Sequence, residues 1–146
     1  MNEDIFHLGI KALIKNNEGK ILLLRVNLEK LTMKDKGAYW DIPGGRIHKG
    51  STIEETLKRE VEEETGISSI KSFSKLDMVL SNIRIPQGDT TLGLILGIYV
   101  CETDDTTNIT ISDEHTEAKW FEPKDAAKLL AIKYPSEFCS KIAGLQ

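Results

Sequence analysis

Three glutamates crowded beside an arginine are the residues of this chain best suited to chemistry: Arg59, Glu60, Glu63 and Glu64. Carboxylate oxygens are the ligands that hard divalent cations such as magnesium prefer. Such cations neutralise the charge that opposes reactions at phosphate groups. The cluster therefore indicates a site for a divalent cation and points to phosphate chemistry. The alternative interpretation is an acidic helix face that simply lies in solvent.

These glutamates fall in a segment that is expected to form a helix. Ser51 or Thr52 is a suitable N-cap, and Gly66 stands where a left-handed residue commonly ends a helix. At about 100° per residue, Glu60 and Glu64 lie on or beside the apolar stripe of this helix. The stripe is made of Ile53, Leu57 and Val61.

Burial of the two glutamates on this stripe needs compensation, because an unpaired carboxylate is costly to remove from water. A bound cation or the neighbouring Arg59 could provide that compensation. Glu63 lies further round the same flank, where it could add a ligand. A solvated acidic face explains three other glutamates well but explains Glu60 and Glu64 poorly. Those three are Glu54, Glu55 and Glu62.

The composition is that of a globular protein. The chain has 146 residues, of which 40% are hydrophobic and 29% charged, and we expect residues 1–146 to form a single domain. A net charge of −4 disfavours nonspecific binding to nucleic acid. Cys101 and Cys139 make no disulfide framework, no apolar run reaches membrane-spanning length, and the N-terminus shows no signal-peptide pattern. These features predict a cytoplasmic protein without a membrane partner.

The elements that must position the glutamates are mostly strands. Apolar or alternating runs predict strands at residues 6–14, 20–26, 39–42, within 70–84, 90–101, 109–111 and 118–121. Turns are expected at residues 16–19 and 86–89, and polar loops at 27–37 and 102–108. Besides the glutamate helix, residues 123–131 and 135–143 are expected to be helical. This order predicts an α/β fold in which helices cover both faces of a mixed sheet.

The stretch that begins at Gly45 and ends at Ile67 resembles the Nudix box. The run REVEEETGI, at residues 59–67, follows Gly45 at the spacing of that motif, and the preceding WDIPG resembles the family's approach to the box. Two positions depart from the pattern. Ser51 stands where the family usually has glutamate, and His48 stands where an acidic residue is common.

The resemblance implies a Nudix-type α/β/α sandwich and a hydrolase that depends on Mg²⁺ or Mn²⁺. Glu60, Glu63 and Glu64 match the family's metal-binding glutamates, and Arg59 would pair with one of them and fix its rotamer. The implied reaction is attack by water on the pyrophosphate bond of a nucleoside diphosphate linked to another group. Nucleoside triphosphates, nucleotide sugars, ADP-ribose and dinucleoside polyphosphates all remain open as substrates. A non-catalytic nucleotide-sensing domain is the alternative, because Ser51 departs from the motif.

A catalytic base must come from another position if Ser51 cannot supply it, because serine does not take up a proton near neutral pH. Related enzymes often draw a glutamate from the loop before a late strand. The resemblance therefore implies Glu114, in preference to Glu117, as that base or as an additional metal ligand. His7 and His115 show no spacing that suggests a zinc site.

Substrate contacts are expected from arginine and glycine residues near these elements. Arg25 and Arg46 could bind phosphate, because a guanidinium group matches phosphate oxygens. Gly44 and Gly45 would let the backbone approach closely or adopt a positive φ. Three aromatic residues either stack on a base or pack in the core: Phe6, Tyr39 and Trp40. The expected partner is a small nucleotide, and self-association as a homodimer is left open.

Overall fold

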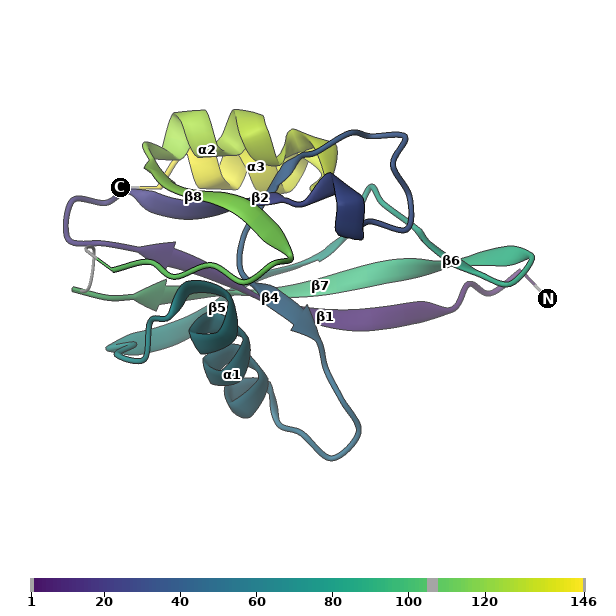
Figure 1. Cartoon of the computed structure of the whole chain (residues 1–146), viewed down its shortest axis with the longest axis horizontal. Helices are drawn as coiled ribbons and strands as arrows, with labels where there is room; N and C mark the ends of the chain where they lie inside the picture. The colour runs from purple at the N-terminus through teal and green to yellow at the C-terminus, as the bar shows by residue number, and fades with distance from the viewer. Residues whose placement is uncertain (1, 105–107, 146) are drawn as a thin grey trace.

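A mixed β-sheet forms the centre of the computed structural model, which describes residues 2–104 and 108–145 (Figure 1). Its strands are β1 (Phe6–Lys15), β2 (Ile21–Val26), β3 (Trp40–Asp41), β4 (Gly44–Arg46), β5 (Ser72–Leu80), β6 (Ile85–Gln87), β7 (Thr90–Glu102) and β8 (His115–Phe121). The main path through the sheet is β3–β2–β1–β7–β5. β1 runs parallel to β7 and antiparallel to β2 and β4, so it is the strand on which the sheet is built.

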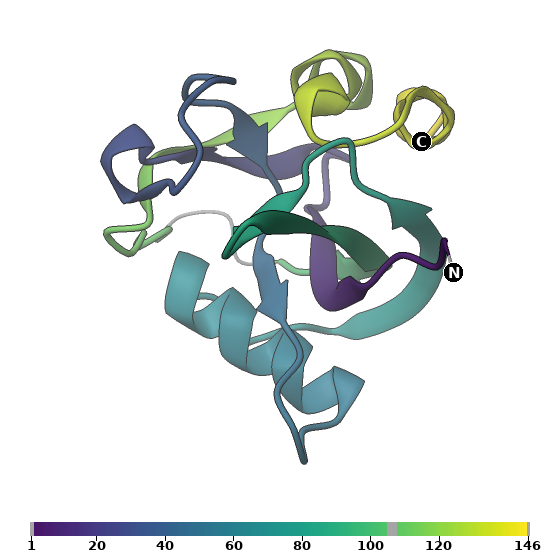
Figure 2. The same cartoon turned by 90° about the vertical axis from the view of Figure 1, so that its right-hand side faces the viewer.

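Helices cover both faces of this sheet. α1 (Ile53–Thr65) lies on one face, whereas α2 (Pro123–Leu129) and α3 (Ser136–Ala143) lie on the other (Figure 1, Figure 2). Two short 3₁₀ turns, η1 (Leu28–Lys30) after β2 and η2 (Leu130–Ile132) between α2 and α3, complete the described elements. The predicted α/β/α sandwich is therefore confirmed.

Each face of the sheet has its own apolar core, because successive strand residues point to opposite sides. In β1, Ile10, Ala12 and Ile14 pack toward α1, whereas Leu13 packs toward α2 and α3. Full burial of each large apolar side chain stabilises the fold by about 1.5–3 kcal/mol. The helices complete the two cores with Leu57 and Val61 on one side, and with Leu130, Phe138 and Ile142 on the other.

α1 forms where the local signals predict a helix. Thr52 is the N-cap, its hydroxyl accepting a hydrogen bond from the Glu55 N–H, and Gly66 closes the helix with a φ of 79°. Leu57 and Val61 are buried as predicted. The prediction for Ile53 is wrong, because the first turn of α1 projects away from the sheet (Figure 1) and leaves this side chain 38% exposed.

Several predicted elements differ from the structure where pairing over long distances decides the outcome. Residues 44–46 form β4, a strand that was not predicted, because they pair with β1. Residues 109–111 form no strand, and Ile109 and Ile111 instead pack against the core under α1. β8 begins at His115 rather than at Ala118. Of the predicted loop at 102–108, residues 105–107 lie outside the described residues.

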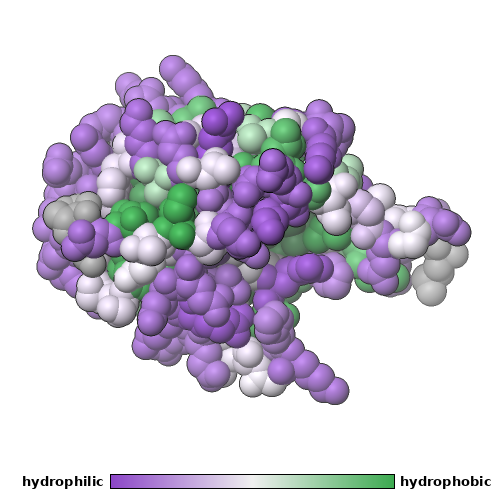
Figure 3. Space-filling model, viewed as in Figure 1, coloured by the Kyte–Doolittle hydropathy of each residue, from purple (hydrophilic) through white to green (hydrophobic). Residues whose placement is uncertain are grey.

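The outer face of α1 is solvated. Hydrophilic residues cover the lower part of the molecule in Figure 3, where α1 lies in Figure 1. The three glutamates that a solvated acidic face explains are exposed there: Glu54, Glu55 and Glu62. The interpretation as a solvated acidic face is thus correct for these three residues, and any chemical role belongs to the other glutamates of the helix.

Two further sequence expectations can be compared with the structure. Cys101 and Cys139 are free thiols, and Cys101 is buried in the core. Among residues 2–104 and 108–145, no helix has both the length and the apolar character needed to cross a membrane.

Candidate functional site

Glu64 is a carboxylate that the fold buries, with only 3% of the residue exposed. Its Oε2 atom accepts a hydrogen bond from the Gly44 N–H at 3.0 Å, so β4 fixes one of its two oxygens. Burial raises the pKa of Glu64 to about 7, against the opposing effects of the Lys11 ammonium and the Gly44 hydrogen bond. The nearby carboxylate of Glu60 adds to the rise. The folded chain thus holds an incompletely compensated carboxylate on the inner face of α1.

The two glycines of β4 are required by this close packing of β4 between β1 and α1. Gly44 has a φ of 150°, and a Cβ atom there would lie 2.2 Å from the Ile10 carbonyl oxygen. A Cβ atom at Gly45 would lie 2.7 Å from the carboxyl carbon of Glu60. Side chains at these positions would therefore displace β4 or the glutamate that lies against it.

Glu64 belongs to a group of three potential metal ligands, which we name the carboxylate–imidazole group: Glu64, Glu114 and His115. One ligand atom from each of these residues lies within 4.8 Å of the other two. Glu114 is exposed, whereas Glu64 and His115 are buried. The Nε2 atom of His115 lies 3.8 Å from the Glu64 Oε1 atom.

His115 has an unusual environment for a buried imidazole. Burial lowers its pKa to about 4, with a further lowering from Lys11, so the ring is neutral at physiological pH. Among the described residues, its buried Nδ1 atom has no hydrogen-bond partner. A divalent cation fits this donor set, because it would compensate the buried carboxylate and bind a neutral imidazole.

The turn that carries Glu114 and His115 is held against the end of β2. Asn27 donates two hydrogen bonds of 2.9 Å, from its backbone N–H to the Glu114 carbonyl and from its side chain to the Asp113 carbonyl. Lys30 makes a 3.3 Å ion pair with Asp113. β8 then pairs with β2, with a register shift between Arg25 and Val26. These contacts bring the turn to the same place as the inner face of α1.

The other residues of the acidic motif lie outside the carboxylate–imidazole group. Arg59 makes a 3.3 Å ion pair with Glu60, as the predicted pairing of this arginine with a glutamate requires. Glu63 is exposed. Ser51 is half-buried and lies just before the N-cap of α1. Metal binding by Glu60 and Glu63 therefore stays a prediction.

Asp41 is the centre of a second buried polar cluster, the Asp41 network: Lys11, Asp41, Lys133 and Tyr134. Its Oδ2 atom accepts hydrogen bonds from the ammonium groups of Lys11 at 3.1 Å and Lys133 at 2.6 Å. Its Oδ1 atom accepts one from the Tyr134 hydroxyl at 2.6 Å and one from the Ile42 N–H at 2.8 Å. Burial alone would raise the pKa of Asp41, but the two ammonium groups and these hydrogen bonds outweigh burial and hold the pKa well below its usual range.

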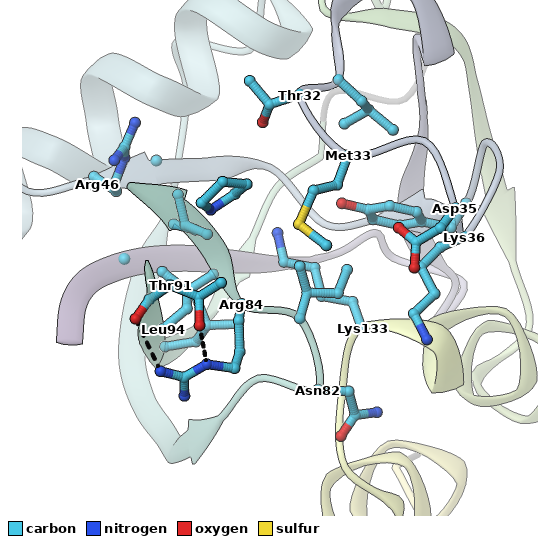
Figure 4. A pocket seen from close by; sticks show the side chains of 18 of the residues that line it. Thr32, Met33, Asp35, Lys36, Arg46, Asn82, Arg84, Thr91, Leu94 and Lys133 are labelled. Carbon is cyan, nitrogen blue, oxygen red and sulfur yellow. Dashed lines mark hydrogen bonds between the residues drawn. The ribbon is translucent and has the colours of Figure 1, made fainter. Parts of the chain in front are cut away.

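A cavity of about 530 Å³ opens beside the Asp41 network (Figure 4). Its wall includes Lys11 and Lys133 from the Asp41 network and Gly45 and Arg46 from β4. Loop residues between β2 and β3 close one side of it, with Met33 pointing into the space near Lys133 (Figure 4). β4 and Lys11 therefore connect the cavity with the carboxylate–imidazole group.

The positive charge of the cavity comes from a few residues. Arg84 is also at its wall, but a two-fold ion pair with Asp4, at 2.7 and 2.9 Å, and a hydrogen bond to Thr91 occupy its guanidinium group. Arg46 is exposed and free to turn toward a ligand. Lys11 and Lys133 share a single carboxylate, so the Asp41 network carries one excess positive charge at the wall.

A set of hydrogen bonds holds Lys133 in place. The Asn82 side chain donates to the Tyr134 carbonyl at 2.9 Å and to the Ala131 carbonyl at 3.2 Å. The Asn82 N–H and the Ser81 hydroxyl both donate to the Lys133 carbonyl, at 2.8 and 2.9 Å. The segment after β5 thus ties the connection between α2 and α3 to the rim of the cavity.

The predicted substrate residues fall at different places. Arg46 and Gly45 line the cavity, and Gly44 supports Glu64 from behind. Arg25 is exposed and does not line the cavity; it pairs with Trp40 and Glu117 across the sheet. Of the three aromatic residues, Tyr39 lines the cavity, Trp40 packs edge-on against Phe121, and Phe6 is 38% exposed.

Five residues of the two clusters were not singled out from the sequence: Lys11, Asp41, Lys133, Tyr134 and His115. Lys11 carried a signal, since a lysine within the apolar run of β1 must find a buried partner. Asp41 and Lys133 carried none, because their relation depends on contacts between distant segments. His115 was discounted for lack of a zinc-like spacing, although it directly follows Glu114.

The fold and the buried glutamate on α1 define a hydrolase of Nudix type, and comparisons with known proteins agree. The NUDIX domain family model matches residues 5–138. A "MutT-like protein" of Streptomyces ambofaciens is 26% identical over 136 residues, which are 93% of this chain and 77% of that protein. "Nucleoside triphosphatase NudI" of Escherichia fergusonii is 27% identical over 119 residues, which are 77% of this chain and 79% of that protein.

A solved structure has the same fold. The crystal structure of the MutT protein from Methanosarcina mazei Go1 matches with a TM-score of 0.68 at 24% identity, covering 97% of this chain and 96% of that one. The chain therefore belongs to the NUDIX family. It is an enzyme of the Nudix pyrophosphohydrolase class, as the resemblance predicted.

Proposed function

We propose that this protein is a divalent-metal-dependent hydrolase that cleaves the pyrophosphate bond of a nucleoside diphosphate linked to another group. The observation that carries the proposal is that β4, which fixes the Glu64 carboxylate of the carboxylate–imidazole group, also lines a cavity with a cationic wall. A nucleotide needs both features, because its phosphates are anionic and its base and sugar need a cavity.

The cation would be held by Glu64, with Glu60 and Glu63 as further ligands predicted from the motif. Glu114 would serve either as an additional ligand or as the catalytic base. Mg²⁺ or Mn²⁺ would neutralise the phosphate oxygens and orient the attacking water. The Gly44 N–H keeps the Glu64 carboxylate in position, and the Arg59 guanidinium does the same for Glu60.

Glu114 is our candidate for the catalytic base. Its side chain is exposed, so it can exchange a proton with solvent, while Asn27 holds its backbone in place. Among the described residues, Cys101 is buried and Cys139 is part-buried, and neither thiol is paired with a histidine. Direct attack by water at phosphorus therefore suits the site better than a covalent enzyme intermediate.

The cavity favours a substrate with a compact nucleoside end. Lys11, Lys133 and Arg46 can contact phosphate or acceptor atoms of the base, and Met33 and Tyr39 offer apolar surface. The relative named nucleoside triphosphatase supports a nucleoside triphosphate as the first substrate to test. Mg²⁺ or Mn²⁺ as the cation, a single domain over residues 1–146 and a cytoplasmic location are further parts of this proposal. Self-association as a homodimer stays open.

The reaction can be tested with a panel of nucleoside triphosphates, nucleotide sugars, ADP-ribose and dinucleoside polyphosphates, each with Mg²⁺ or Mn²⁺. A coupled phosphatase would report the phosphorylated products. In ¹⁸O-labelled water the label should enter a phosphate product and leave the sugar hydroxyls unlabelled. Label in a sugar hydroxyl would contradict attack at phosphorus.

Metal binding can be tested separately by thermal unfolding. A divalent cation should raise the melting temperature of the wild type, and Glu64→Gln should lose most of that rise. Glu62→Gln is the matched control, because Glu62 lies on the exposed side of the same helix. Equal shifts in the wild type and Glu64→Gln would show that the buried glutamate holds no cation.

A nucleotide-sensing domain without turnover is the second candidate, because Ser51 stands where the family usually has glutamate. This candidate predicts that a nucleotide raises the melting temperature while neither cation supports hydrolysis. Such a result would replace the hydrolase proposal.

A further inference from the structure

We propose that His115 is itself a ligand of the bound cation, alongside Glu64 and Glu114, and that it makes the site favour nitrogen-accepting transition ions such as Co²⁺ over Mg²⁺. The proposal rests on the proposed function for the presence of a cation. It goes further by adding a nitrogen ligand that the acidic motif does not contain.

The distance between His115 and Glu64 is the first observation. The Nε2 and Oε1 atoms are 3.8 Å apart, which is too long for a hydrogen bond. Two ligand atoms that each lie about 2.1 Å from one ion stand about 3–4 Å apart. The separation therefore suits a shared cation better than a direct contact.

The second observation is independent of the carboxylates. His115 is only 8% exposed, and in the described part of the chain its buried Nδ1 atom has no hydrogen-bond partner. Buried polar atoms in native proteins almost always have a partner, and an unpaired one costs about 1–3 kcal/mol. A cation would bind Nε2, the atom that faces Glu64, so it would offset the cost of burying the ring without giving Nδ1 a partner.

The orientation of Glu64 agrees with this assignment. The Gly44 N–H occupies Oε2, so Oε1 is the oxygen that faces His115. Asn27 donates hydrogen bonds to the Asp113 and Glu114 carbonyls and so holds the turn that precedes His115, the first residue of β8. The two sides of the site therefore face each other before an ion binds.

The choice of ion follows from ligand chemistry. Mg²⁺ takes oxygen ligands and keeps several waters, so an imidazole adds little to its affinity. Imidazole nitrogen suits first-row transition ions, whose affinities also rise from Mn²⁺ to Co²⁺ and Ni²⁺. One histidine beside two glutamates should therefore separate Co²⁺ from Mg²⁺ more than an all-carboxylate site would.

A measurement on the wild type tests the ligand directly. Pulsed electron paramagnetic resonance of protein loaded with Mn²⁺ should show a coupling to ¹⁴N that changes to ¹⁵N when only histidine is ¹⁵N-labelled. Bound Mn²⁺ without a histidine coupling would overturn the inference and leave the proposed hydrolase standing. If no cation binds at all, both the inference and the metal-dependent function fail.

Variants then assign the coupling and test the selectivity. His115→Gln should remove the nitrogen coupling and weaken Co²⁺ binding by at least about tenfold, while Mg²⁺ binding changes less than about threefold. His48→Gln is the matched control, because His48 is exposed, and it should change neither affinity. Equal weakening of both ions by His115→Gln, or loss of the coupling in His48→Gln, would show that His115 is not the ligand.

Discussion

Asp41 and Glu64 are equally buried, each 3% exposed, yet their surroundings have opposite effects on them. Asp41 accepts two hydrogen bonds from ammonium groups, one from a hydroxyl and one from a backbone N–H. Glu64 accepts one, from the Gly44 N–H, and faces an imidazole at 3.8 Å. The pKa of Asp41 is held well below its usual range, whereas that of Glu64 is raised to about 7.

The comparison separates a completed polar cluster from one that lacks a partner. Burial penalises both carboxylates, so the number and charge of their donors decide the sign of the shift. The Asp41 network has all its donors within the chain. The carboxylate–imidazole group lacks positive charge, and a cation is the partner that its chemistry would accept. Burial of Asp41 thus serves the structure, whereas the equal burial of Glu64 serves the function.

The largest effect should come from breaking the completed cluster. Asp41→Asn would leave the ammonium groups of Lys11 and Lys133 buried without a counter-charge, so the free energy of unfolding should fall by about 3–5 kcal/mol. Asp77→Asn is the control, since its 3.2 Å pair with Lys141 is partly exposed and should be worth about 1 kcal/mol or less. Urea unfolding measures both. Equal losses in the two variants would show that the buried Asp41 network contributes no more to stability than a partly exposed ion pair.

In cation-free protein, the pH dependence of stability should distinguish Glu64 from His115. The folded-state pKa of Glu64 is raised from 4.5 to about 7, so its ionisation lowers stability as pH rises through that window. The folded-state pKa of His115 is lowered from 6.5 to about 4, so its contribution raises stability as pH increases from 4 to 6.5. These two contributions largely cancel in the wild type.

Single variants should reveal the hidden slopes. Relative to the wild type, Glu64→Gln should gain stability and His115→Gln should lose it as pH rises from 4.5 to 6.5, each by up to about 3 kcal/mol. The charged groups that face both residues, Lys11 and Asp41, remain in place in each variant. Unfolding in a chelator at several pH values measures the slopes. Parallel curves for the two variants would contradict the assigned shifts.

The next effect concerns the turn that faces the buried glutamate. Glu114→Gln should lower kcat by about 10²-fold, as expected when a positioned base is lost. Glu117→Gln should cost less, because Glu117 lies on β8 opposite Arg25 and is not a member of the carboxylate–imidazole group. Steady-state kinetics with saturating cation compares them. A larger loss in Glu117→Gln would show that Glu114 is not the base.

The smallest effect is expected at Ser51. An added carboxylate in Ser51→Glu should lower the cation concentration at half-maximal rate by about tenfold or less, the lower range for groups that support metal ligands. Thr52 remains the N-cap, so the helix should keep its stability. An unchanged midpoint and an unchanged rate would show that position 51 does not limit the site.

The parts of the fold that depend on local signals could be predicted from the sequence. The cap at Thr52, the end of α1 at Gly66 and the alternation in β1 are all encoded in neighbouring residues. β4 could not be predicted, because Gly44 and Gly45 become a strand only through pairing with β1.

The candidate site divides in the same way. Glu64 was found from the helical spacing, and Glu114 from the family resemblance; the structure brings their ligand atoms together. In the Asp41 network, Lys11 and Lys133 lie 30 and 92 positions from Asp41 in the sequence, so the local sequence does not predict it. His115 was discounted because ligand spacing along the chain does not reveal a partner on another element, here Glu64 on α1.

The central place of β1 gives the two halves of the site different resistance to opening. Lys11 is on a strand with neighbours on both sides, so its amide should exchange with solvent only when much of the sheet opens. Glu114 is on a turn that Asn27 ties to the end of β2, and such a turn can open locally at far lower cost. The cationic wall is therefore the rigid side of the site. The Glu114 turn is the part that can adjust to the size of the ion and of the phosphate that lie between this wall and the turn.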